Sequence, residues 1–120
     1  MSKTQEVELR VRTKEFALRI VRLYASLPKT TEAQVLGKQV LRSGTSVGAH
    51  YREAQRAKSD ADFISKMGTV EEEADESMYW MELIVEADLM KESLVSALYQ
   101  EADEILAMVV ASIKTAKRTR

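Results

Sequence analysis

Hydrophobic residues recur every three or four positions along most of the chain, a period that predicts α-helices. The first such segment runs from about residue 5 to Leu27. It is predicted to end there because Pro28 follows, and a residue before proline avoids helical geometry. At about 100° per residue, one face of this segment carries five large apolar side chains. They are Leu9, Phe16, Ile20, Leu23 and Leu27.

A second, smaller apolar strip lies on the opposite side of this predicted helix. It consists of Val11, Leu18, Val21 and Ala25. One interpretation is scattered surface hydrophobicity, which is ordinary in folded proteins. The other is a contact between subunits, in which Leu18 and Val21 would lie at the interface.

The second predicted helix is unusual because glycines lie inside it. It begins at Thr30 or Thr31, since Thr31 and Gln34 have the spacing of a capping box. Its expected core face carries Leu36, Val40, Val47, Tyr51 and Ala54. One flank of that face carries Gly37, Gly44 and Gly48. Each glycine costs a helix about 1 kcal/mol relative to alanine, so we expect a neighbouring helix to approach this flank closely.

Ser59 followed by Asp62 predicts the beginning of a third helix, because this spacing places the serine to cap it. Its expected core face carries Phe63, Met67, Val70, Ala74, Met78, Met81 and Val85. The opposite face is acidic, yet it also carries Tyr79 and Leu83. These two residues are either single exposed apolar side chains or part of a contact between subunits.

A short link, Asp88–Ser93, leads into the last predicted helix. Its expected inward residues are Leu94, Leu98, Ala102, Ile105 and Val109. The basic end of the chain, about residues 114–120, is expected to fray. Four long helices with short connections predict one all-α domain over residues 1–120, an antiparallel up-down-up-down four-helix bundle.

The composition agrees with this prediction and narrows the class of protein. The 120 residues include one proline and four glycines, which leaves few turns. The absence of cysteine excludes disulfides and thiolate metal sites. No apolar run approaches the roughly 18 residues of a membrane span, and the charged amino-terminal segment lacks the apolar core of a signal peptide. We therefore expect a cytoplasmic protein without membrane contact.

The net charge of −1 conceals a strong asymmetry along the chain. Residues 1–58 hold 12 Lys and Arg against 5 Asp and Glu, whereas residues 59–110 hold 2 against 14. Such a split suggests complementary faces, either within one fold or between copies of it.

Neither a metal site nor a catalytic site is predicted. Bundles with two-metal carboxylate sites use Glu-x-x-His pairs, whereas this chain has a single histidine, His50, and no such pair. Ser43 and Ser46 lie near His50 by helical angle, but no nucleophile elbow or phosphate loop surrounds them. We expect no enzymatic activity, no cofactor and no small-molecule substrate.

Basic residues are the better candidates for a binding surface. The candidates on the first two helices are Arg12, Arg19, Arg22, Lys38, Arg42, Arg52 and Arg56. Such a stripe could follow a nucleic-acid backbone, because each neutralised phosphate releases counterions. No aromatic residues interleave with the stripe for base stacking. The alternative is that these cations pair with the acidic third helix, in the same chain or in a second copy.

Two stretches of the chain resemble a known family. They are LRSGTSVGAHYREAQRAKSDADFISKM, from Leu41 to Met67, and EEADESMYWMELI, from Glu72 to Ile84. They are similar to bacterial four-helix bundle proteins, also called 23S rRNA-intervening-sequence proteins because some are encoded in insertions within large-subunit rRNA genes. The ending ASIKTAK is similar as well. The family usually has asparagine where this chain has His50.

The resemblance implies a bundle that assembles into a ring of identical copies, commonly a pentamer. A related branch serves as the accessory protein of diversity-generating retroelements, binding a reverse transcriptase and RNA through a basic surface. Most members have no established biochemical activity. We therefore expect a homo-oligomeric scaffold that associates with RNA or a ribonucleoprotein. The alternatives are a protein-binding adaptor without nucleic acid and an accessory subunit of a retroelement reverse transcriptase.

Overall fold

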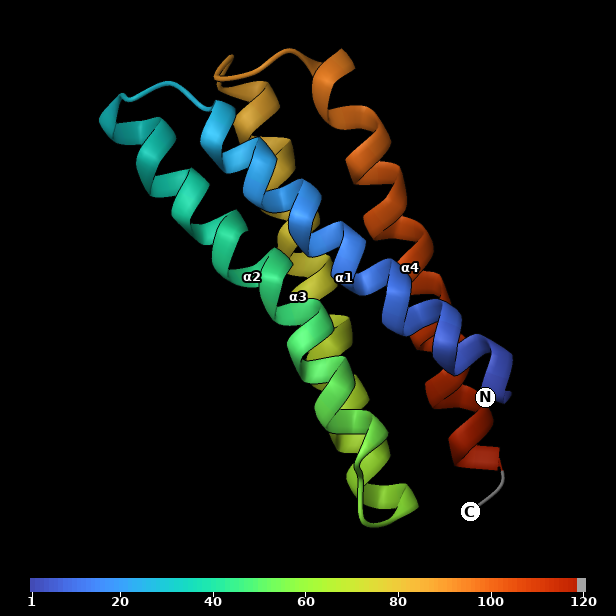
Figure 1. Ribbon diagram of the computed structural model, residues 1–120. Helices are drawn as coiled ribbons and strands as arrows, with labels where there is room; N and C mark the ends of the chain where they lie inside the picture. The colour runs from blue at the N-terminus through green and yellow to red at the C-terminus, as the bar shows by residue number, and fades with distance from the viewer. Residues whose placement is uncertain (119–120) are drawn as a thin grey trace.

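The computed structural model describes residues 1–118, which form four helices: α1 (Lys3–Ser26), α2 (Thr31–Gln55), α3 (Asp60–Glu86) and α4 (Glu92–Arg118). They alternate in direction and form an elongated bundle of 48 × 22 × 19 Å (Figure 1). The described residues contain no strand. The predicted all-α four-helix bundle is therefore confirmed. Helix α4 continues through Arg118, and residues 119–120 lie outside the described residues. The fraying expected for residues 114–120 stays a prediction.

The first three helices begin at hydroxyl caps. The side chains of Ser2, Thr30 and Ser59 accept hydrogen bonds from backbone N–H groups of the first turns of α1, α2 and α3. Each bond satisfies an amide that has no partner within its helix. The predicted cap at Ser59 is confirmed, and of the two threonines considered for α2 the cap is Thr30.

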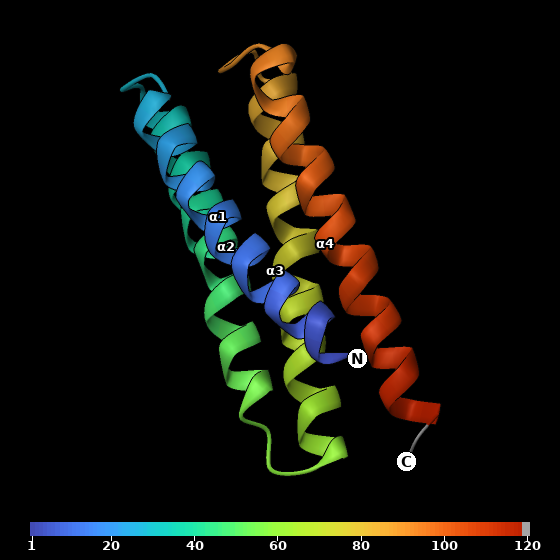
Figure 2. The same ribbon diagram turned by 45° about the vertical axis from the view of Figure 1, so that its right-hand side comes forward.

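The core contains most of the residues that the hydrophobic period predicted. Three predicted core residues, Leu36, Phe63 and Val85, are only partly buried. The prediction for Leu94 is wrong: its side chain is 68% exposed, and Val95 is buried in its place. The reason is the course of α1, whose amino-terminal half lies against α4 while its carboxyl-terminal half leans towards α2 (Figure 2). No helix therefore covers Leu94.

Helices α1 and α2 approach each other closely along the glycine flank, as predicted. A Cβ atom added to Gly44 would lie only 2.7 Å from Cγ1 of Ile20. Carbon atoms in ordinary contact are about 3.5–4 Å apart, so no side chain larger than hydrogen can occupy this position without displacing its neighbour. The glycine sequence thus determines the spacing of the first helical pair. Within the described residues, no helix is long and apolar enough to cross a bilayer.

Candidate interaction surfaces

The seven basic residues singled out in the sequence do not form one surface. The structure separates them into two arginines that pair with other helices, two arginines beside a groove, and three cations on the outer side of α2. Each set has different neighbours and therefore a different capacity to bind a ligand.

Arg12 joins α1 to α4. Its Nε and Nη2 donate to the two carboxylate oxygens of Glu101 at 2.9 and 2.7 Å, and Nη2 also donates to Glu104 at 3.0 Å. The hydrogen bond to Glu101 is the main reason that the pKa of Arg12 is raised, and the bond from Arg12 lowers the pKa of Glu104. A bidentate pair of this kind is strong and directional. Arg12 therefore holds the bundle together and is not a free cation.

Arg42 joins α2 to α3 in a similar way. Its guanidinium pairs with Glu76 and lies 3.4 Å from Oε2 of Glu73. Pairing between the basic stripe and the acidic third helix, one of the alternatives considered from the sequence, thus occurs within this chain at Arg42. About half of the Arg42 side chain stays exposed, so the contribution of this pair to stability is small.

Arg19 and Arg22 border a groove of about 310 Å³ between the carboxyl-terminal half of α1 and the beginning of α4. Leu23 and Leu98 are buried at its base, and the exposed Leu94 stands at its rim. The sequence could not indicate this groove, because it exists only where α1 and α4 diverge.

Lys38 and Arg52 are exposed on the outer side of α2, and Arg56, the residue that follows the last turn of this helix, is exposed on the same side. Among the described residues none of them pairs with a carboxylate. Arg42, Thr45 and Ala49 share this side of the helix between them, and the exposed Glu53 borders it. The three cations are therefore available to a negatively charged ligand.

His50 lies on the flank of α2 without a catalytic partner. Its Nδ1 is 3.5 Å from Oε2 of Glu53, one turn further along the same helix. No group of three or more histidine, aspartate or glutamate side chains within residues 1–118 is placed to hold a metal ion. The contact that the structure shows for His50 is thus with Glu53 on the same helix.

The outer stripe of α1 is a line of exposed residues on the side opposite the core: Val7, Val11, Lys14, Leu18 and Val21. Leu18 and Val21, predicted at an interface, are 47% and 45% exposed. Val7 extends the line by one turn and is 58% exposed. The sequence analysis missed Val7, although it precedes Val11 by four positions and could have been found from that spacing.

The other predicted interface residues lie on α3 and differ in exposure. Tyr79 is 53% exposed and packs edge-on against Trp80, with ring centroids 5.1 Å apart. Leu83 is only partly exposed. The face opposite the core of α3 is thus apolar mainly at Tyr79.

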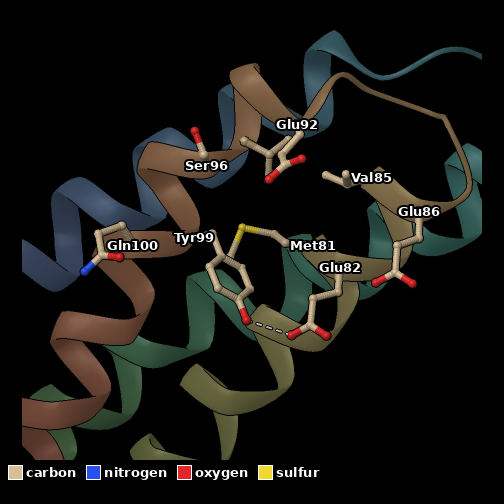
Figure 3. Close-up of a pocket in the computed structure, with 9 residues that line it drawn as sticks. Met81, Glu82, Val85, Glu86, Glu92, Ser96, Tyr99 and Gln100 are labelled. Atoms are coloured by element: carbon tan, nitrogen blue, oxygen red, sulfur yellow. Dashed lines mark hydrogen bonds between the residues drawn. The ribbon is translucent and has the colours of Figure 1, made fainter.

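An acidic cleft of about 400 Å³ lies between the carboxyl-terminal half of α3 and the beginning of α4 (Figure 3). We call it the α3–α4 cleft. Its apolar floor consists of Met81, Val85 and Val95, and its acidic rim consists of Glu82, Glu86 and Glu92. Tyr99 also lines it and donates a hydrogen bond to Glu82 over 2.8 Å. That bond is the main reason that the pKa of the Tyr99 hydroxyl is raised, and the nearby carboxylates of Asp103 and Asp75 add to the effect. The sequence could not predict that these acids surround one cleft, because this depends on how α3 and α4 are rotated about their axes relative to each other.

Comparisons with known proteins agree with the fold. Residues 5–111 match the family described as 23S rRNA-intervening sequence protein. The chain is similar to a crystal structure from Bacteroides thetaiotaomicron, described as a protein with unknown function from the S23 ribosomal protein family. The two share 37% identity over 92% of this chain and 98% of that chain, with a TM-score of 0.86. No curated protein matches.

Proposed function

The chain belongs to the 23S rRNA-intervening sequence protein family, and from this premise we propose that it is a non-enzymatic cytoplasmic scaffold that binds RNA or a ribonucleoprotein. The observation that carries the proposal is the exposure of Lys38, Arg52 and Arg56 on α2 without an acidic partner among the described residues. Arg12 and Arg42, which pair with α4 and α3, are not part of the proposed surface. The family description, which names no enzymatic activity, supports the same proposal.

The arrangement of the three cations suits a phosphate backbone. Arg52 and Arg56 are one turn apart, about 6 Å along the helix, and Lys38 lies about 21 Å from Arg52. A phosphate backbone carries condensed cations, and each protein cation that neutralises a phosphate releases some of them, so binding should weaken as the salt concentration increases. For three contacts to a single strand, the logarithm of affinity should fall with the logarithm of salt concentration with a slope of about −2.

The test is fluorescence anisotropy with a labelled single-stranded RNA, titrated at several salt concentrations. R52E/R56E should lose binding and flatten the salt dependence. The matched control is K29E/K91E, which changes the net charge equally but lies in the two turns outside the α2 surface. If both variants weaken binding equally, binding follows net charge and the α2 surface is not the site.

Self-association is the second part of the proposal. We propose that copies of the chain form a ring, five in number as the resemblance implies, because the outer stripe of α1 leaves four apolar residues exposed over about four turns of the helix. L18E/V21E and Y79E/L83E should each give single copies by native mass spectrometry, with helicity retained by circular dichroism. An assembly that survives both double substitutions would place the interface elsewhere, and a loss of helicity would place these residues in the core.

One observation favours a second candidate function, a protein-binding adaptor without nucleic acid. The groove between α1 and α4 combines the exposed Leu94 with two arginines that have no carboxylate partner among the described residues. A retroelement reverse transcriptase is a partner of this class. The adaptor predicts a protein that co-purifies after nuclease treatment and is lost in L94E, whereas the RNA-binding scaffold predicts bound mass that nuclease removes.

A further inference from the structure

Helix α1 has apolar residues on two opposite sides, and only one of them is covered. On the uncovered side, four of the five residues of the outer stripe are apolar, and each is between 45% and 58% exposed. The stripe follows the spacing i, i+4, i+7, i+11 and i+14, so its members form one continuous line about 21 Å long. Lys14 lies in the middle of this line, and Arg22 extends beyond Val21. The exposed acids Glu8 and Glu15 flank the line as well. A continuous exposed apolar line with a cation at its middle and another at its end indicates a contact surface that can meet a negative counterpart.

The α3–α4 cleft has the complementary properties. Its floor is apolar, and the carboxylates of Glu82, Glu86 and Glu92 surround it. Among the described residues no lysine or arginine pairs with any of these three acids. Asp75 and Asp103 add to the negative potential at Tyr99. A cleft of one sign with apolar walls attracts a segment of the opposite charge.

A glycine on α3 provides an independent observation. Gly68 lies on the same line of α3 as Asp75, Glu82 and Glu86, which follow it by 7, 14 and 18 residues. A Cβ atom added to Gly68 would meet nothing within 4 Å, whereas the other three glycines each contact a neighbouring helix. A glycine inside a helix costs about 1 kcal/mol relative to alanine, and no contact within one copy explains it. A close approach by a second chain would explain why glycine stands at this position.

We propose that the α3–α4 cleft of one copy receives the outer stripe of α1 from a second copy. The proposal rests on the self-association proposed above and adds which two faces meet. The apolar line of α1 lies over the floor of the cleft, and Lys14 and Arg22 face the carboxylates of its rim. This is the recognition of an amphipathic helix by a groove. Because the two faces differ, copies join head to tail, an arrangement that gives a ring when the rotation between copies closes. The cations of α2 remain outside this contact.

Charge reversal on each face separately tests the pairing. The stripe variant is K14E/R22E, and the cleft variant is E86K/E92K; none of these four side chains makes an ion pair or hydrogen bond within the described chain. The matched control is E32K/D60K, which reverses two exposed acids in the first turns of α2 and α3. Self-association is measured by sedimentation velocity, with circular dichroism to establish that each variant is folded.

Each reversed variant alone should self-associate at least tenfold more weakly than the wild type and the control. An equimolar mixture of the two should recover association, as open or even-numbered assemblies in which the two variants alternate, because the reversed stripe of one meets the reversed cleft of the other. A mixture that does not recover overturns the pairing of these faces. If both variants associate like the control, the pairing is wrong while self-association stands. If the wild type is a single copy at all concentrations, self-association itself fails, and the RNA titration is unaffected.

Discussion

Replacement of glycine by alanine should have opposite effects at two positions of this bundle. At Gly44 the new methyl group would lie 2.7 Å from Cγ1 and 2.9 Å from Cγ2 of Ile20, a residue that is fully buried. Relieving such overlap in a packed core costs about 1–3 kcal/mol. The gain in helix propensity is about 1 kcal/mol, so G44A should be destabilised by about 1 kcal/mol. At Gly68 nothing opposes the same gain, so G68A should be stabilised by about 1 kcal/mol.

The assay is urea unfolding followed by circular dichroism, at a protein concentration low enough to keep copies apart, since assembly would add to the apparent stability. The two variants should differ by about 2 kcal/mol, or about 8 °C in melting temperature for a domain of this size. Equal stability of G44A and G68A would refute the account of the α1–α2 contact. At higher concentration G68A should self-associate less than the wild type, because its methyl group lies on the line of α3 that leads to the α3–α4 cleft, about 21 Å before Glu82.

Three further predictions concern single side chains. R12A should lose about 2 kcal/mol of unfolding free energy near neutral pH, because it breaks a bidentate, partly buried contact. Glu104 has a pKa below its ordinary value of 4.5 in the folded state, so its stabilisation is complete above that pH and is lost as the pH falls through the folded pKa. The difference between wild type and R12A in urea melts should therefore shrink in acid. S112A should be neutral or up to about 1 kcal/mol more stable, because the buried Oγ of Ser112 has no hydrogen-bond partner; a clear loss would show that this hydroxyl is satisfied. L94E should change the free energy of unfolding by less than about 0.5 kcal/mol, whereas V95A should lower it by about 2 kcal/mol in the same melts. A larger loss in L94E than in V95A would show that Leu94 faces the core, as the sequence predicted.

The number, order and bounds of the helices followed from local chemistry. Pro28 ended α1, hydroxyl caps began the next two helices, and the hydrophobic period placed most of the core. The glycine flank of α2 correctly indicated a close helix, because glycine inside a helix requires a packing reason. These features depend on residues within a few turns of one another, which is the range over which a sequence pattern is informative.

Features that depend on the rotation of one helix against another could not be predicted. The first turn of α4 offered two adjacent apolar residues, Leu94 and Val95, and the choice between them depends on where α1 lies. Arg12 and Arg42 looked like members of an open stripe because their partners lie on helices distant in sequence. The acidic cleft was missed for the same reason. Surface function in a bundle is therefore harder to read from sequence than its architecture.

The order of helix contacts also bears on how the chain folds. Within the described residues, each helix packs against its neighbours in sequence, and α1 against α4 closes the bundle. Helix pairs that are adjacent in sequence should form before the contact between α1 and α4, because that contact must close the longest loop. The ion pair of Arg12 with Glu101 belongs to the contact between α1 and α4. Loss of the Arg12 contact should accelerate unfolding and leave the folding rate nearly unchanged. The contact therefore slows the unfolding of the native state.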